Sequence, residues 1–254
     1  MKKIILILGV ILITFIISLV GVSILSSLYL NNEFKDPELT IQAVDSIDKR
    51  TLQVSGNWLK YERQGLWTLV TSGAAMERGI REGVLTKSLI YKQERAFVNQ
   101  IKKLVPSEFY LNFLKYLISL NNYWLHDAIP PENREEIYGV SRSASPQFDY
   151  ISSGYQRILN YHGAHDLGHF LSNLGMVGCS SFGVWGDKTT DGKLLIGRNF
   201  DFYVGDEFAK EKVVSIILPD SGYNLAIITW GGITGVVSGM NEKGLTVTIY
   251  ASNS

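Results

Sequence analysis

The chain contains a single cysteine, Cys179, and the residues around it could support nucleophilic chemistry. Cys179 follows a glycine and begins a run with strand character, and Asp191-Gly192 marks a turn further along. A hairpin closed at this turn would bring Arg198, on the returning run, beside the cysteine. A cation close to a thiol favours the thiolate, which is the nucleophilic form. A lone cysteine without such a neighbour is more often a small buried apolar residue.

Asp201 lies three residues after Arg198 on the same returning run. In a regular strand the two side chains point to opposite faces, unless the strand bulges or ends there. The alternative to a catalytic role is an ordinary surface ion pair between the two, worth about 0–1 kcal/mol. Both interpretations remain open on spacing alone.

Three ordered motifs in the C-terminal part resemble those of the cysteine N-terminal-nucleophile hydrolases. They are Gly178-Cys179-Ser-Ser-Phe, then Asp191-Gly192-Lys-Leu-Leu-Ile-Gly197-Arg198-Asn199-Phe-Asp201, then Gly239-Met-Asn-Glu-Lys-Gly244-Leu-Thr-Val. This superfamily includes penicillin V acylase and choloylglycine hydrolase. Because a long segment precedes the cysteine, the chain is more similar to the autoproteolytic acyl-coenzyme A:6-aminopenicillanate (isopenicillin N) acyltransferase group.

The resemblance implies a precursor that cleaves itself between Gly178 and Cys179 when the thiol attacks the preceding carbonyl. The new α-amino group, with an unperturbed pKa of about 7.7–8.0, would then serve as general base for its own thiol. By the same resemblance Asp201 accepts a hydrogen bond from that amino group, and Arg198 is the cation beside the thiol. A backbone N–H around Tyr250 would belong to the oxyanion hole. No metal or other cofactor is implied.

The reaction implied by the resemblance is cleavage or transfer of an acyl group from a small N-acyl amide, through a thioester at Cys179. The family fold is an αββα sandwich with antiparallel strands, completed by a longer C-terminal part that supplies an asparagine and another arginine. We therefore expect residues 179–254 to be an incomplete catalytic domain, from a truncated product, a fragment or the first piece of a split gene. A truncated, inactive binding protein is the alternative.

A second group of residues with chemical potential lies just before the cysteine. His162, His165 and His169 are spaced so that a helix would place them on one face, and together with Asp166 they could hold a catalytic zinc ion. Two glycines within the segment weaken the helix prediction. Histidines on a helix also serve as capping or core groups, so we expect a packing role and no metal site.

The overall composition narrows the function classes. The chain has 254 residues, and its 24 basic and 24 acidic side chains argue against a nucleic-acid-binding protein, which would show a basic excess. One cysteine excludes a disulfide within the chain. A hydrophobic content of 46% with six prolines excludes a disordered or collagen-like chain.

The N-terminal stretch of residues 4–30 contains no charged side chain and follows Lys2 and Lys3. As a helix it would be about 40 Å long, which exceeds a hydrocarbon core of about 30 Å. We expect an uncleaved signal anchor over residues 1–30, with the lysines in the cytoplasm and the remaining chain outside. The alternative is a cleaved signal peptide, which has a shorter apolar core.

Three further segments follow the anchor. Residues 31–60 are polar and predict a spacer, and residues 61–178 predict a mainly helical pro-segment. Its helices are expected from Ala74 to about Val105 and from Phe109 to Trp124, after a short strand-like run at 67–71. Gly79 and Gly83 share a face of the first helix and indicate a close backbone approach there.

The segment of residues 179–254 predicts short antiparallel strands separated by turns. The expected strands are Cys179–Gly186, Leu194–Phe202, Lys212–Leu218, Asn224–Trp230 and Leu245–Ala251. A helical first part followed by strands indicates the α+β class, with the break between Gly178 and Cys179.

Overall fold

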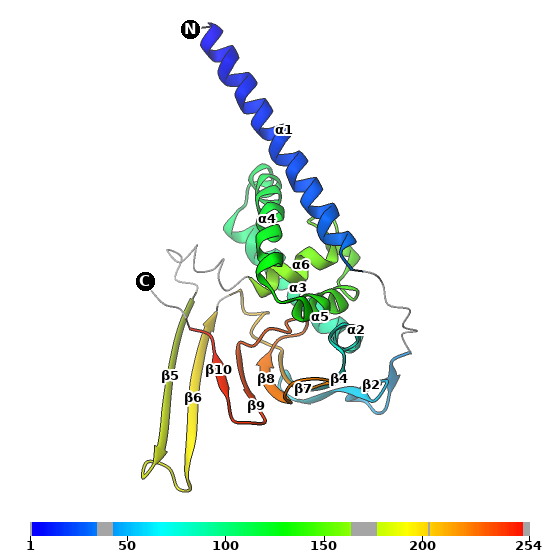
Figure 1. Cartoon of the computed structure of the whole chain (residues 1–254), viewed down its shortest axis with the longest axis vertical. Helices are drawn as coiled ribbons and strands as arrows, with labels where there is room; N and C mark the ends of the chain where they lie inside the picture. Colours follow the sequence, from blue (N-terminus) through cyan, green and yellow to red (C-terminus); the bar gives the residue numbers. More distant parts are fainter. Residues whose placement is uncertain (1, 35–42, 164–176, 203, 251–254) are drawn as a thin grey trace.

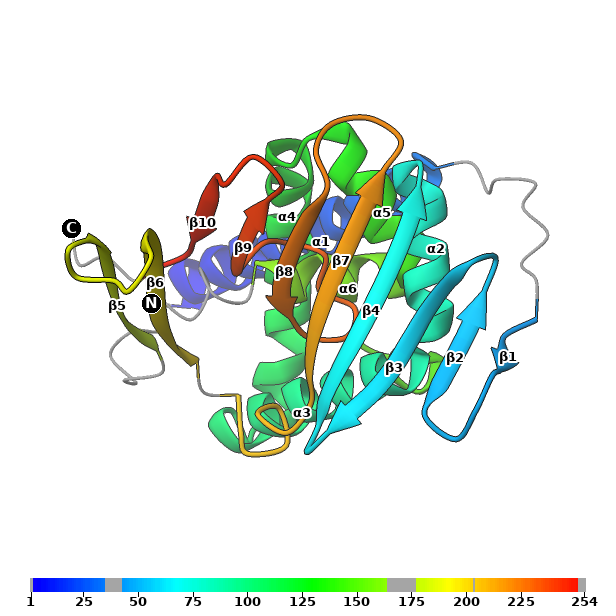
Figure 2. The ribbon, with the colours of Figure 1, turned by 90° about the horizontal axis from the view of Figure 1, so that it is seen from below.

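The computed structural model describes residues 2–34, 43–163, 177–202 and 204–250. It is a mixed α/β structure in which helices cover one face of a mixed sheet (Figures 1 and 2). Helix α1 (Lys2–Asn32) extends away from this body, and a two-stranded hairpin projects at the other end (Figure 1). The structure therefore has the predicted combination of an N-terminal apolar helix, a helical layer and strands.

The helical layer contains the two helical regions that the sequence predicts. The first is divided at Thr86 into α2 (Ala75–Leu85) and α3 (Lys87–Leu104), where the Thr86 hydroxyl donates a hydrogen bond of 2.7 Å to the carbonyl of Glu82. The second is α4 (Glu108–Ala128), whose N-cap is Ser107. Helix α5 (Pro131–Ser141), a 3₁₀ turn (Pro146–Phe148) and α6 (Gly154–His162) complete the layer.

Helices α2 and α5 pack with their backbones in close contact, as the two glycines predict. A Cβ atom on Gly79 would lie 2.1 Å from the carbonyl oxygen of Glu136, and one on Gly83 would lie 2.9 Å from that of Val140. Gly139 makes the matching close approach from α5. The contact surface therefore leaves no room for a side chain at these positions.

A charged pair is buried in this helix contact. Arg78 donates two hydrogen bonds, of 3.1 and 3.0 Å, to the carboxylate of Glu136, and a third to the carbonyl of Gly73. Glu82 is buried nearby, and desolvation, reinforced by the negative charge of Glu136, raises its pKa to about 8. Glu82 is therefore protonated at neutral pH in the folded protein.

The sheet has the strand order β1-β2-β3-β4-β7-β8-β9-β10 (Figure 2). Its strands are β1 (Asp45–Ser46), β2 (Thr51–Val54), β3 (Asn57–Arg63), β4 (Leu66–Gly73), β7 (Lys212–Pro219), β8 (Leu225–Thr229), β9 (Ser238–Asn241) and β10 (Thr246–Thr248). Strands β4 and β7 are parallel, whereas the other neighbours are antiparallel. The strands that follow Cys179 pair antiparallel with one another, as predicted. The sheet is mixed because β4, a strand of the predicted pro-segment, pairs in parallel with β7.

The predicted spacer of residues 31–60 also needs correction, because β1, β2 and the first part of β3 lie within it. Ser55 and Gly56 have φ values of 46° and 76°, which suit a tight two-residue hairpin turn. Val54 and Leu59, on either side of this turn, are buried against α2 and α3. The polar composition concealed a hairpin that buries only alternate residues.

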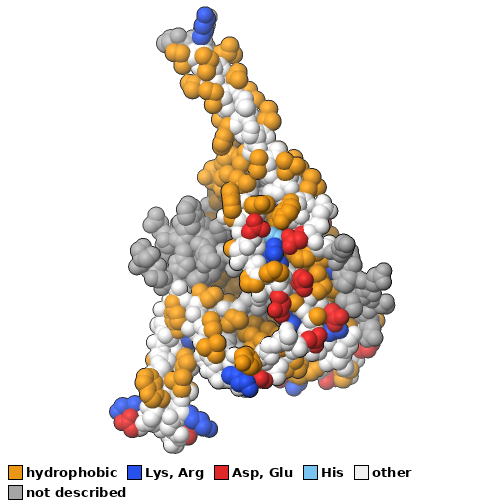
Figure 3. Space-filling view, in the orientation of Figure 1, with side chains coloured by type: hydrophobic (Ala, Val, Ile, Leu, Met, Phe, Trp, Pro, Cys, Tyr) orange, Lys and Arg blue, Asp and Glu red, His pale blue; other side chains and the backbone are white. Residues whose placement is uncertain are grey.

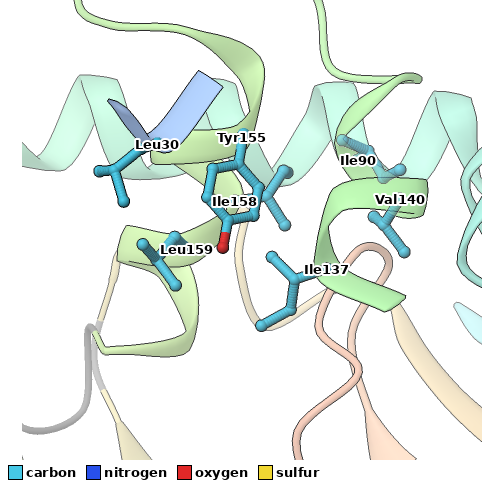
Figure 4. Close-up of a cluster of buried hydrophobic side chains, with 7 residues drawn as sticks. All are labelled: Leu30, Ile90, Ile137, Val140, Tyr155, Ile158 and Leu159. Atoms are coloured by element: carbon cyan, nitrogen blue, oxygen red, sulfur yellow. The ribbon is translucent and has the colours of Figure 1, made fainter. Parts of the chain in front are cut away.

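The C-terminal end of α1 is part of the main core. Leu30 packs with Ile90 of α3, with residues of α5 and with Tyr155, Ile158 and Leu159 of α6 (Figure 4).

Beside this cluster the buried ring of His126 contacts Tyr155 at 2.8 Å and also the side chains of Glu33 and Arg134. Burial lowers the pKa of His126, against the opposing effect of Glu33. The end of α1 is thus fixed to the body.

The face of the sheet that is turned away from the helices is apolar and exposed within the described part of the chain. Ile216 on β7, Ile228 on β8 and Met240 on β9 are 36%, 54% and 55% exposed. On the same strands Val213, Ile217 and Ile227 are buried on the helix side. A sheet with apolar side chains on both faces is typical of one that is covered on both.

Candidate functional site

Cys179 and Arg198 lie on one hairpin, formed by β5 (Val177–Gly186) and β6 (Gly192–Phe202). The turn between the strands is bounded by Gly186 and Gly192, both with positive φ, and the Asp191 carboxylate accepts a hydrogen bond from the backbone of Lys193. The resulting register pairs Cys179 with Phe200 and Ser181 with Arg198. The hairpin predicted from the Asp191-Gly192 turn is therefore present.

The base of the hairpin is attached to the helical body by aromatic side chains. The ring of Phe200 lies 5.8 Å from that of Trp230, and the ring of Phe202 lies 5.7 Å from that of Phe208. Phe208 in turn packs against Phe97 of α3. These contacts hold the cysteine end of the hairpin on the body, whereas the turn end projects away (Figure 1).

The guanidinium group of Arg198 lies beside the half-buried thiol of Cys179, with Nη2 at 3.7 Å from Sγ. Because paired residues share a face of the hairpin, Cys179, Ser181, Arg198 and Phe200 all point to the same side. The contact is thus a diagonal one across the two strands. A positive charge is available where a thiolate would form.

Arg198 is held by residues at the start of β9 and just after β10. Its Nη1 donates to the carbonyl of Val237 at 2.6 Å and to the hydroxyl of Ser238, and its Nη2 donates to the carbonyl of Ile249. The guanidinium also lies over the rings of Phe200 and Tyr250, at 4.6 and 5.2 Å from their centroids. A charged side chain with this many contacts has little rotational freedom.

Asp201 is not brought to the thiol. It pairs with Gly178 across the hairpin, so its side chain lies on the face opposite that of Cys179 and Arg198. The carboxylate is exposed and accepts a hydrogen bond of 2.6 Å from the side chain of Asn199. The strand has no bulge at this point. Arg198 and Asp201 therefore lie on opposite faces, as expected for a regular strand. The position across from Gly178 is adjacent to the Gly178–Cys179 peptide bond.

The structure brings the side chain of Tyr250 to the site. Its ring lies over Arg198, and a hydrogen bond from the Ser181 hydroxyl lowers the pKa of the Tyr250 phenol, with smaller contributions from Thr248 and Arg198. Sequence reasoning missed Ser181, although a residue two positions after Cys179 on a strand must share its face. The position of Ser238 could not be predicted from the sequence, because the pairing of the sheet strands brings this residue to the site.

The histidine-rich segment is described only at its first member. His162 ends α6; its Nε2 accepts a hydrogen bond from the backbone N–H of Thr234 at 2.9 Å, and its Nδ1 contacts the carbonyl of Ile158 at 2.8 Å. The ring is therefore neutral with its proton on Nδ1, and burial lowers its pKa. His165, Asp166 and His169 lie outside the described residues. Among the residues that are described, no group of side chains could hold a metal ion.

Comparison with known proteins adds one distant relative. No protein-family model matches the chain. The chain is similar to an uncharacterised protein of Archaeoglobus fulgidus, with 25% identity over 200 residues that cover 72% of this chain and 32% of the relative. The chain thus spans about a third of the length of that relative, which is a longer polypeptide.

Proposed function

We propose that the chain is the precursor, or the first part, of a cysteine amidohydrolase or acyltransferase of the N-terminal-nucleophile type. The observation that carries the proposal is the fixed guanidinium of Arg198 at 3.7 Å from the thiol of Cys179. This contact lies on a hairpin whose sequence resembles that family. The substrate would be a small N-acyl amide.

Activation would begin at the Gly178–Cys179 bond. The sulfur of Cys179 attacks the carbonyl carbon of Gly178, and the C–N bond breaks as its nitrogen gains a proton, which leaves a thioester. Water then hydrolyses the thioester, so that Gly178 ends in a carboxylate and Cys179 carries a free thiol and α-amino group. Glycine before the cysteine presents little steric obstruction to this attack. Asp201 pairs with Gly178 across the hairpin, and by the resemblance its carboxylate would accept a hydrogen bond from the new amino group.

In turnover the α-amino group would accept the proton of the thiol, and the sulfur would attack the acyl carbon of the substrate. The amine leaves with a proton, and water or an acceptor amine releases the acyl group from the thioester. Arg198 stabilises the sulfur anion, and Asp201 orients the amino group. A backbone N–H near Tyr250 would contact the oxyanion.

The exposed apolar surfaces support an αββα sandwich completed by further polypeptide. The outer face of the sheet carries Ile216, Ile228 and Met240, and the projecting hairpin carries Phe182 and Trp185, which are 58% and 64% exposed. An isolated two-stranded hairpin is marginally stable in water, so a covering layer is expected. The longer relative is in keeping with such an addition. The same surfaces favour the second candidate function, an inactive member that uses them to bind a partner.

We also infer that α1 anchors the protein in a membrane, with the other residues outside the cell. Within the described residues, one helix, Lys3–Leu30, is long and apolar enough to cross a bilayer. Lys2 and Lys3 at the start of the helix favour the cytoplasmic side for its N-terminus.

The proposed chemistry is tested by trapping the thioester. The natural gene product, incubated with a panel of N-acyl amides and quenched with acid, should show the acyl group on the peptide that contains Cys179, in a form that hydroxylamine removes. Cys179→Ala should abolish the adduct, whereas Ser180→Ala, an exposed neighbour on the other face of the hairpin, should retain it. Turnover that survives Cys179→Ala and is lost to a chelator would assign the chemistry to a metal hydrolase instead. A substrate-binding protein that never forms the adduct would support the binding function.

A further inference from the structure

The end of the helical layer where α3 gives way to α4 presents large apolar side chains to the surroundings. Ile101, Leu104, Phe109 and Tyr110 are 45%, 40%, 85% and 50% exposed. We name residues 101–110 the α3–α4 tip. Lys102 and Lys103, in the last turn of α3, are also exposed on it. Aromatic and aliphatic side chains with flanking lysines are typical of surfaces at the boundary between a bilayer and water.

Helix α4, which begins at the tip, packs against α1. Ser119 of α4 donates a hydrogen bond to the carbonyl of Ser23 and accepts one from the hydroxyl of Ser26, and further along both helices the ring of Tyr29 lies 5.6 Å from that of Tyr123. Because these pairs advance in the same direction, α1 and α4 are parallel. The N-terminal end of α4, and the tip with it, therefore points along α1 toward the chain's N-terminus (Figure 1). In Figure 3 hydrophobic side chains cover α1 and continue onto the part of the helical layer next to it.

The length of the uncovered part of α1 sets the depth of the tip. From Ile4 to Ser18 every side chain is exposed, and Leu19 is the first buried residue of the helix. These residues make a helix of about 22 Å, which is shorter than a hydrocarbon core of about 30 Å. A spanning α1 must therefore use about five more residues, down to about Ser23. That part of α1 is the part that packs against α4.

From this arrangement we propose that the α3–α4 tip is a second membrane contact, which inserts into the leaflet on the same side as the body. The occupant of the apolar surface is the bilayer that α1 spans, so the inference rests on the anchoring proposed above. Phe109 and Tyr110 enter the acyl chains of this leaflet, and the long side chains of Lys102 and Lys103 extend to the anionic headgroups. The body is then docked against the membrane in one orientation and does not swing freely on a tether.

The test is the depth of a fluorescent probe in vesicles. The full chain with Cys179→Ser receives one cysteine at a time, at Phe109, at Ile11 in α1 or at Ile47 in the β1–β2 turn, and is labelled with a nitrobenzoxadiazole dye. All three positions are exposed in the structure. Each protein is reconstituted into vesicles of phosphatidylcholine and phosphatidylglycerol that carry a nitroxide near either end of the acyl chain. Tyr110→Cys provides a second tip position, and circular dichroism establishes that each variant is folded.

Fluorescence at position 109 should be quenched by the nitroxides in the acyl chains, with a blue-shifted emission. Position 11 should be quenched best by the nitroxide near the chain ends, and position 47 by neither. Quenching at 11 without quenching at 109 and 110 would overturn the docking of the tip and leave the anchor in place. A probe at 11 that no nitroxide quenches would overturn both proposals.

Discussion

The contact between Arg198 and Cys179 is the residue-level feature on which the proposed chemistry depends. Iodoacetamide alkylates the thiolate, so Arg198→Ala should slow alkylation of Cys179 roughly tenfold, the effect of losing about 1.4 kcal/mol of charge stabilisation. The second-order rate is measured on folded protein at neutral pH. Arg95→Ala, which removes an exposed cation on α3, is the control and should leave the rate unchanged. Equal rates for Arg198→Ala and the unaltered chain would remove Arg198 from its assigned role.

Glu82 gives a prediction about pH and stability. Its folded-state pKa of about 8 exceeds the ordinary value of 4.5, so between these two pH values the folded state binds more protons than the unfolded state. The contribution of Glu82 to stability is therefore present below about pH 4.5 and lost as the pH rises to about 8. Glu82→Gln removes this loss and should raise the free energy of unfolding at pH 8.5 by up to about 5 kcal/mol.

The measurement is denaturant unfolding of the protein and the variant at several pH values. The gain from Glu82→Gln should shrink toward zero near pH 4.5. Glu77→Gln, a change in the first turn of the same helix at a half-exposed position, should reproduce the pH dependence of the unaltered chain. Parallel curves for the chain and Glu82→Gln would contradict a proton held on Glu82.

Only the contacts of the site that depend on local geometry could be predicted from the sequence. The proximity of Arg198 to Cys179 follows from one hairpin turn, which sets the register of two neighbouring strands. The groups that hold Arg198 could not be found in this way, because Val237 and Ile249 are 39 and 51 residues further along the chain. Their arrival at the site depends on the pairing of β8, β9 and β10.

At the level of elements, the contact between α2 and α5 has the clearest energetic consequence. Gly79→Ala would put a Cβ atom within 2.1 Å of a backbone oxygen of α5, which cannot move without the helix. We expect a loss of stability of about 1–3 kcal/mol or more, as for other overpacked cores. Gly21→Ala on α1, where nothing lies within 4 Å, should change stability little. Equal melting temperatures in detergent for the two variants would show that the helices are not in close contact.

The elements were predictable where the hydrophobic pattern is local. The helices within 74–105 and 109–124, and the strands after Cys179 other than β9, follow from spacing and turn residues. Strand β9 (Ser238–Asn241) was not predicted. The parallel pairing of β4 with β7 could not be predicted, because it joins segments separated by the entire helical layer. Strands β1 to β3 were missed since a short hairpin that buries alternate residues has the composition of a polar loop.

At the level of the whole molecule, the eight-stranded sheet joins the segments before and after Cys179 into one folded unit. Its strands come from both sides of the Gly178–Cys179 bond, so cleavage there would leave two segments joined by the β4–β7 pairing and by the core beneath it. The mature protein would therefore remain one folded unit of two chains. The exposed outer face and hairpin indicate where further polypeptide would add.

The most direct test of the account is the N-terminal sequence of the mature, active product of the natural gene, together with any polypeptide encoded after residue 254. The account predicts a fragment that begins with Cys179, because only a free α-amino group on this residue can act as base within reach of its own sulfur. Cys179→Ala should abolish both cleavage and activity, and Cys179→Ser should cleave slowly, since a hydroxyl is far less acidic than a thiol. An active protein in which the Gly178–Cys179 bond is intact would contradict the mechanism.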